Sequence, residues 1–187
     1  DIDSALHDAY AWALMSSDEG MALIRSSEQR YRAKYELRRQ SEFGGAELCR
    51  RLGDGEYRFP FLIYKEYVSG GTNLSMANEG FSHPCTLAVA NGVGMVRLHP
   101  VDLSARSQMT GREMNGRVRR LMYLDGSAFA PAYDDGSTIS FPARTLHFLN
   151  IGSGVGQILH GSVCLRMQCS VGTKHMPEST AIFTILI

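Results

Sequence analysis

The sequence predicts an α+β domain in which N-terminal helices pack on a mostly antiparallel, split β-sheet. Residues 1–54 carry eighteen charged side chains, eight basic and ten acidic, and no proline, a composition that favours helix. Residues 136–187 carry only four charges and are rich in Ile, Val, Leu, Phe and Thr, as in strands covered on both faces. Helices followed by strands favour an α+β domain over alternating βαβ units. We therefore expect a helical N-terminal segment at residues 1–54 and a β-rich core at residues 55–187 of the same single domain.

Three helices are expected in the N-terminal segment. Apolar residues at helical spacing predict the first helix over residues 4–15. Ser17 is the expected N-cap of a second helix, because it is followed by two acidic residues that the helix dipole favours. That helix continues to about residue 39. A short third helix over residues 45–52 is expected to end at Gly53.

From residue 57 onward the pattern changes to aromatic and β-branched residues. Residues 57–68 predict one strand, with Pro60 near its start or at a sheet edge. Further strands are expected over residues 86–90, 95–99, 138–141, 145–151, 158–168 and 180–187. Residues 101–125 are mixed, and their pattern leaves helix and strand open.

The charge balance bears on the partners of the protein. Nineteen Lys and Arg residues balance nineteen Asp and Glu residues, so the whole chain has no net charge that would attract nucleic acid. The basic run of the second helix contains Glu28 and Glu36, each four residues from Arg32, which predicts a solvated, salt-bridged helix face. The run at residues 117–120 is less compensated; it could contact a phosphate-bearing ligand or an acidic partner, and an exposed turn fits it better. No stretch approaches the ~18 apolar residues of a membrane span. We expect no nucleic-acid partner and no membrane span.

The cysteines and histidines give no metal or disulfide signature. Cys49, Cys85, Cys164 and Cys169 are too scattered for a disulfide scaffold, and no CxxC or CxxH pair completes a zinc site. Residues 83–85 read His-Pro-Cys, but the proline favours an extended backbone that separates the imidazole from the thiol. A cysteine hydrolase acting through Cys85 is therefore kept only as a third functional class.

Three short motifs occur in a suggestive order along the chain. The first is Tyr57-Arg58 or Tyr64-Lys65 on the expected first strand, the second is Ser137-Thr138-Ile139-Ser140, and the third is Glu178, the only acidic residue after Asp135. Together with the helical N-terminal part, this order resembles the mono-ADP-ribosyltransferases of the arginine-serine-glutamate class. Within that class the chain is most similar to the XopAI- and HopO-like type III effectors of plant-pathogenic bacteria such as Xanthomonas.

The resemblance implies a mono-ADP-ribosyltransferase-like fold, NAD as the cofactor and no metal. Lys65 or Arg58, with the neighbouring Tyr64, would bind the NAD phosphates, and Ser137, Thr138 and Ser140 would shape the nicotinamide pocket. Glu178 would be the catalytic carboxylate that stabilises the oxocarbenium-like transition state. Each motif departs from the family pattern: lysine replaces arginine, the serine motif has one extra residue, and no second glutamate follows. Both an active NAD-dependent transferase and a pseudoenzyme that has lost NAD binding remain open.

The resemblance also implies a location and a partner. It describes an effector that the bacterium secretes into the host-cell cytoplasm, where it acts on a host protein. The alternative is a non-catalytic module that uses the same cleft to bind a protein or peptide. If residues 57–68 form one regular strand, Lys65 shares a face with Phe59, Phe61 and Ile63, so an anion must meet its charge in a largely apolar cleft.

Overall fold

The computed structural model describes residues 2–67, 73–106, 113–150, 157–171, 174–175 and 178–187. Three α-helices lie in its N-terminal part: α1 (Ile2–Ser16), α2 (Asp18–Leu37) and α3 (Gly45–Leu52). Ser17 caps α2, since its hydroxyl accepts a hydrogen bond of 2.9 Å from the Gly20 N–H. α3 ends at Gly53, whose φ of +78° favours glycine. The predicted Ser17 cap and the end of α3 are confirmed.

The larger of two sheets is arranged around the strand β12 (His160–Val171), which pairs with four other strands. Its nine strands are β1 (Glu42–Gly44), β3 (Phe61–Lys65), β6 (Leu103–Arg106), β7 (Glu113–Asp125), β8 (Ala128–Pro131), β11 (His147–Leu149), β12 (His160–Val171), β13 (Lys174–His175) and β14 (Ser179–Leu186). All the pairings are antiparallel. β14 lies between β12 and β3, so the last described strand of the chain is internal to the sheet.

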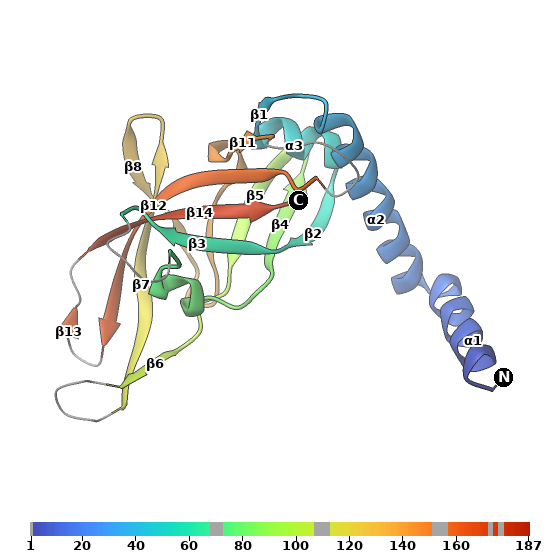
Figure 1. Cartoon of the computed structure of the whole chain (residues 1–187), viewed down its shortest axis with the longest axis horizontal. Coiled ribbons are helices and arrows are strands. Elements are labelled where there is room, and N and C mark those ends of the chain that lie inside the picture. Colours follow the sequence, from blue (N-terminus) through green and yellow to red (C-terminus); the bar gives the residue numbers. More distant parts are fainter. Residues whose placement is uncertain (1, 68–72, 107–112, 151–156, 172–173, 176–177) are drawn as a thin grey trace.

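The smaller sheet has five strands in the order β2-β4-β5-β10-β9. These strands are β2 (Gly55–Phe59), β4 (Cys85–Ala90), β5 (Val93–Leu98), β9 (Tyr133–Asp134) and β10 (Ile139–Pro142). Two short 3-10 helices, η1 (Met76–Gly80) and η2 (Ala143–Thr145), lie in connections between strands. Figure 1 shows the two sheets stacked, with the helices at one end.

The expectation of an α+β domain with a single split sheet is wrong. The described chain is mostly β, with two antiparallel sheets, and the strand β1 lies inside the segment that the sequence predicts to be helical. The undecided residues 101–125 contain the strands β6 and β7. The charge pattern misled the prediction because a strand with one solvated face, such as β1 with its exposed Glu42 and buried Phe43, keeps charged residues and does not stand out from the helices around it.

Pro60 explains why one expected strand becomes two. β2 ends at Phe59 in the smaller sheet, and β3 begins at Phe61 in the larger one. Proline has no N–H to continue a ladder, and its carbonyl here accepts a hydrogen bond of 2.9 Å from the Leu186 N–H. The chain therefore crosses from one sheet to the other at Pro60.

The core lies between the two sheets and is built largely of aromatic side chains. Phe141 of the smaller sheet meets Phe183 of the larger sheet edge to face, with ring centroids 5.3 Å apart. Phe183 also stacks on Phe61 at 5.3 Å. These three fully buried rings join the layers at the centre of the sandwich.

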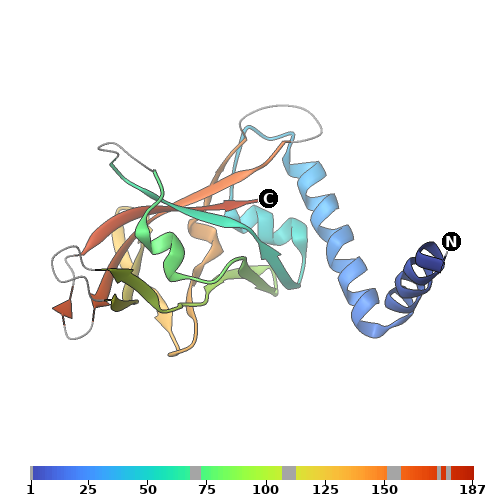
Figure 2. The same ribbon diagram turned by 60° about the horizontal axis from the view of Figure 1, so that its bottom comes forward.

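The helices differ in how they contact the sandwich. α3 packs against β5 and η2, and the buried Tyr57 hydroxyl of β2 donates to the carbonyls of Leu52 and Gly53 at 2.9 and 3.0 Å. α2 touches the sandwich through its last turns, where Ala33 and Leu37 are buried. Figure 2 shows the rest of α2 and all of α1 projecting away from the sheets. None of the described helices is both long and apolar enough to cross a membrane.

Candidate functional site

The outer face of the smaller sheet carries the polar residues of its strands. In β4, Cys85 and Leu87 are buried in the core, so Thr86 between them faces outward. In β5, Val96 and Leu98 are buried on either side of Arg97. The strict alternation places every second residue of these strands on one solvated surface.

The strand register aligns four exposed or half-buried residues of this face and the buried Ser140 in one row across the sheet. Arg58 is opposite Thr86, Thr86 is opposite Arg97, Arg97 is opposite Ser140, and Ser140 is opposite Tyr133. We call these five residues the arginine row. Neighbouring strands lie about 4.8 Å apart, so the backbones of Arg58 and Arg97 are about 10 Å apart, with the threonine between them.

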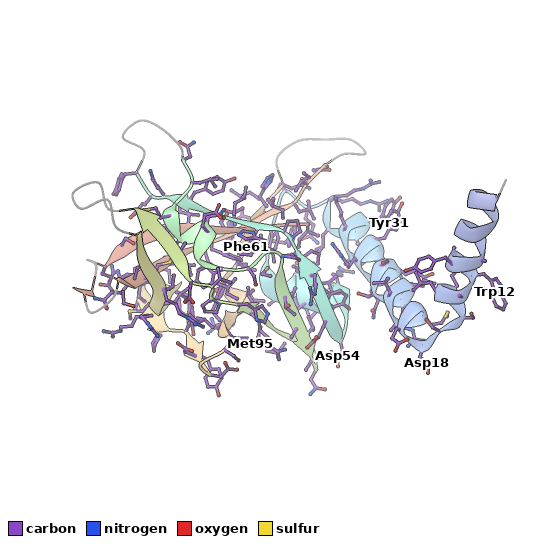
Figure 3. All side chains as sticks on the ribbon, turned by 90° about the horizontal axis from the view of Figure 1, so that it is seen from below. Trp12, Asp18, Tyr31, Asp54, Phe61 and Met95 are labelled. Atoms are coloured by element: carbon purple, nitrogen blue, oxygen red, sulfur yellow. The ribbon has the colours of Figure 1, made fainter. Side chains whose placement is uncertain are left out.

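The arginine row forms the floor of a pocket of about 460 Å³. The remaining lining residues are Glu56, Met95, His99, Asp135 and Thr138. Its volume is within the range of small-molecule sites. Met95, labelled in Figure 3, marks this side of the sandwich.

One of the two carboxylates in the pocket is fully engaged by its own turn. Asp135 accepts hydrogen bonds from the backbone N–H groups of Thr138 and Ser137, at 2.7 and 2.8 Å, and from both of their hydroxyls at 3.0 and 2.9 Å. These bonds, led by the Thr138 N–H, lower the pKa of Asp135 well below its usual range. The carboxylate stays ionised, and its acceptor sites are used within the turn.

The second carboxylate is paired with one of the arginines. Glu56 Oε1 lies 3.0 Å from the Arg97 guanidinium. Arg58, by contrast, makes no ion pair with any residue in the described part of the chain. An incoming anion therefore meets one free guanidinium and one that is shared with a surface carboxylate.

The chemistry of the pocket suits recognition of an anion. Two guanidinium groups offer forked N–H donors that match carboxylate or phosphate oxygens, and the hydroxyls of Thr86 and Ser140 lie between and beside them. Met95 and Tyr133 supply the apolar surface. The described residues contain no group of three or more His, Cys, Asp and Glu side chains that could hold a metal ion.

The structure brings some of the residues chosen from sequence together and separates the others. Arg58, Thr138 and Ser140 all line this pocket. Ser137 donates its backbone N–H to Asp135, which is also a lining residue. Tyr64, by contrast, is half-buried in β3 of the other sheet and pairs with Ile182 of β14. Residues of the expected NAD site thus lie in two different sheets.

Lys65 and Glu178 do not join the pocket either. Lys65 ends β3 and is exposed, so its charge is hydrated and needs no anion in an apolar cleft. The strand break at Pro60 removes the shared face with Phe59 on which that expectation depended. Glu178 precedes β14 and is also exposed.

Cys85 is not arranged as a nucleophile. Burial raises the pKa of its thiol to about 12, and the thiol donates to the Phe59 carbonyl at 3.3 Å. His83 instead stacks on Phe61, with centroids 3.9 Å apart, and its Nε2 lies 2.8 Å from the Asn78 carbonyl oxygen. The two side chains therefore do not form a Cys–His pair, and the hydrolase class is not supported.

Sequence reasoning missed Thr86, Arg97, His99 and Tyr133 as members of the site. For Thr86, Arg97 and His99 the signal was the alternation within the expected strands over 86–90 and 95–99, where a polar residue beside apolar ones points out of the core. Tyr133 lies outside every expected strand, so no such signal marked it. Which outward residues share a pocket depends on strand pairing, and local alternation does not contain that information.

Neither a protein-family model nor a curated protein matches this sequence. Among solved structures, the chain is similar to the NEAT5 domain of IsdX2, a B. anthracis hemophore in complex with heme, with a TM-score of 0.46 and 14% identity over 71% of this chain and 96% of that chain. A mutant of IsdX2-NEAT5 in complex with heme gives the same TM-score and identity, over 71% of this chain and 95% of that chain.

The structure corrects the resemblance drawn from sequence. The described chain forms two antiparallel sheets instead of an α+β domain on one split sheet, and the residues of the expected NAD site are divided between the two sheets. The expected family, the type III effector function and NAD as cofactor are therefore wrong. The physical reason is that the three motifs occur in the expected order along the chain but do not meet in space: Lys65 and Ser140 belong to different sheets.

Proposed function

We propose that this domain binds a small anionic ligand, a carboxylate or phosphate joined to an apolar group, on the outer face of its smaller sheet. The observation that carries the proposal is the arginine row, in which Arg58 and Arg97 flank the Thr86 hydroxyl in one register position. Arg58 has no carboxylate partner in the described chain, and the pocket around it has the volume of a small-molecule site.

The energetics favour an anion with an apolar part over a bare ion. A hydrogen bond to a charged group contributes about 1.5–3 kcal/mol, so two such bonds alone correspond to a Kd between about 6 mM and about 40 μM. Contact with Met95 and the exposed Tyr133 adds apolar burial of about 25 cal/mol per Å². A ligand such as an aromatic carboxylate therefore exploits both kinds of surface.

The test is a calorimetric titration of the intact chain with benzoate, phenyl phosphate and inorganic phosphate. We expect the two aromatic anions to bind more tightly than phosphate, and Arg58→Ala to weaken binding about 10-fold. The matched control is Arg120→Ala, which removes an exposed arginine from β7 of the other sheet. An equal loss of anion affinity in both variants would show that only the net charge of the protein matters. That result would contradict a specific binding site at Arg58.

Heme is titrated alongside as a ligand of different chemistry, because the similar NEAT5 structures contain it. Heme binding that is unaffected by Arg58→Ala, together with no measurable binding of the small anions, would contradict the proposal. Amide chemical-shift changes on adding phenyl phosphate should centre on β4 and β5.

A further inference from the structure

One face of α2 carries an apolar stripe whose side chains are exposed or half-exposed in the described chain. Met21, Ile24, Tyr31 and Tyr35 follow one another at intervals of three, seven and four residues, and Glu28 occupies the position between them. This is the spacing of the a and d positions of a heptad pattern. The helix residues that are buried against the sandwich, Ala33 and Leu37, lie on the opposite side. We call the four apolar residues the tyrosine stripe.

The tyrosine stripe is largely open to solvent. Tyr31 is 74% exposed, Met21 46% and Tyr35 41%. A shallow groove of about 590 Å³ runs beside the two tyrosines and is also lined by Ser27, Glu28 and Arg32. Figure 3 shows Tyr31 on the part of α2 that stands beside the sandwich, and Figure 2 shows the same helix as a projecting arm.

Basic side chains flank the tyrosine stripe on both edges. Arg25 and Arg32, seven residues apart, follow one edge, and Lys34 lies along the other. At the end of the helix, the guanidinium groups of Arg38 and Arg39 lie over the Tyr35 ring, 4.3 and 5.1 Å from its centroid.

These cations are not neutralised within the protein. None of them makes an ion pair with another described residue, and the expected Glu28–Arg32 and Arg32–Glu36 pairs are absent from that part of the chain. Glu36 instead pairs with Arg51 of α3 at 3.0 Å. The flanks of the stripe therefore keep a positive charge that a partner can complement.

We propose that the tyrosine stripe binds an acidic amphipathic helix of a partner protein. An apolar row at heptad spacing matches the a and d side chains of a facing helix, and the flanking cations match acidic residues beside that row. A second copy of this chain does not meet these requirements, because an antiparallel pair of α2 helices would place Arg25 and Arg32 against the same arginines, and a parallel pair would place Lys34 against Arg39. The occupant is thus identified by its charge.

The first experiment measures binding of two labelled peptides to the intact chain by fluorescence anisotropy. Both peptides are three heptads long with leucine at a and d; one has glutamate at e and g, and the other has lysine there. We expect the acidic peptide to bind and the lysine peptide to bind at least 10-fold more weakly. Equal binding of both peptides, or no binding of the acidic one, would overturn the proposal.

The second experiment locates the binding surface with matched variants. Tyr31→Ala should weaken the acidic peptide about 10-fold, as expected for an exposed aromatic anchor. Leu23→Ser is the control, because Leu23 is 59% exposed on the same helix but lies off the stripe. Arg25→Glu combined with Arg32→Glu should reverse the preference toward the lysine peptide, and Arg120→Glu should not. Circular dichroism of each variant checks that α2 is retained.

Two other binding partners of the tyrosine stripe, a second copy of this chain and an anionic membrane, would give different results. A dimer in analytical ultracentrifugation that is lost in Tyr31→Ala would assign the stripe to a second copy and overturn the proposal. Tighter binding to vesicles of anionic lipid than to the acidic peptide would also overturn it. Arg58→Ala, which removes the free guanidinium of the anion pocket, should leave peptide affinity unchanged, so failure of either site is distinguishable from failure of the other.

Discussion

Glu56 and Arg97 form an ion pair of 3.0 Å across a strand that lies between them. Glu56 belongs to β2 and Arg97 to β5, and β4 separates the two strands in the sheet. The pair reaches across because Ala88 of β4, the register partner of Glu56, has a small side chain. This contact holds one of the two arginines of the pocket and therefore competes with any anionic ligand.

Releasing Arg97 from Glu56 should strengthen anion binding. Exposed ion pairs contribute about 0.2–1 kcal/mol, so Glu56→Gln should tighten the affinity for phenyl phosphate by a factor of about 1.4 to 5. Isothermal titration of wild type and variant at low salt measures the change. Glu79→Gln serves as the control, because it makes the same change of charge at an exposed position of η1, which packs on strands of the other sheet. An equal gain in both variants would assign the effect to net charge alone.

The turn that holds Asp135 should show a defined dependence on pH. Its hydrogen bonds, led by the Thr138 N–H, lower the folded-state pKa of Asp135 below the unfolded value near 4. A lowered pKa contributes stability that is fully present above the unfolded pKa and is lost as the pH falls through the folded pKa. The stability difference between wild type and Asp135→Ala should thus be constant from pH 7 to about 5 and shrink below about 4. Urea unfolding at several pH values tests this, and a difference that grows on acidification would contradict it.

Removing the Tyr57 hydroxyl should destabilise the junction between α3 and β2. This buried hydroxyl donates to the carbonyls of Leu52 and Gly53 at the end of α3, where the last carbonyls of a helix have no partner within the helix itself. Tyr57→Phe should lower the free energy of unfolding by about 1–2 kcal/mol. Urea denaturation provides the measurement, with Tyr67→Phe as control because Tyr67 is 82% exposed. Equal free energies of unfolding for the two variants would show that the hydrogen bonds of the Tyr57 hydroxyl do not stabilise the fold.

Two of the four cysteines should resist alkylation in the folded protein. Burial raises the pKa of Cys49 to about 11 and that of Cys85 to about 12, so both remain thiols and are shielded from reagent. We expect iodoacetamide at pH 8 to modify only Cys164 and Cys169, which are partly exposed, and all four after unfolding in guanidinium. Peptide mass spectrometry identifies the sites. Rapid modification of Cys85 in the native chain would restore it as a candidate nucleophile.

Local signals in the sequence located the helices and some of the strands. The Ser17 cap and Gly53 act through hydrogen bonds and backbone angles within a few residues, so their effect can be read from the sequence alone. The apolar residues of the expected strands, such as Leu87 and Phe183, are buried as alternation indicates. Arg58 and Ser140 were both among the residues chosen from sequence, although for a different chemistry from the one their pocket supports.

The sequence by itself thus determined where the three N-terminal helices lie and which side chains of the expected strands, such as Leu87 and Phe183, point inward. Only the tertiary structure decided that the chain changes sheets at Pro60 and that Arg58 and Arg97 lie in one row. The reason is that a side chain's face follows from a two-residue period, whereas its neighbours across a sheet follow from the pairing and register of strands far apart in the chain. Lys65 and Arg58 illustrate this: seven residues separate them, yet one ends a strand of the larger sheet and the other lines the pocket of the smaller one.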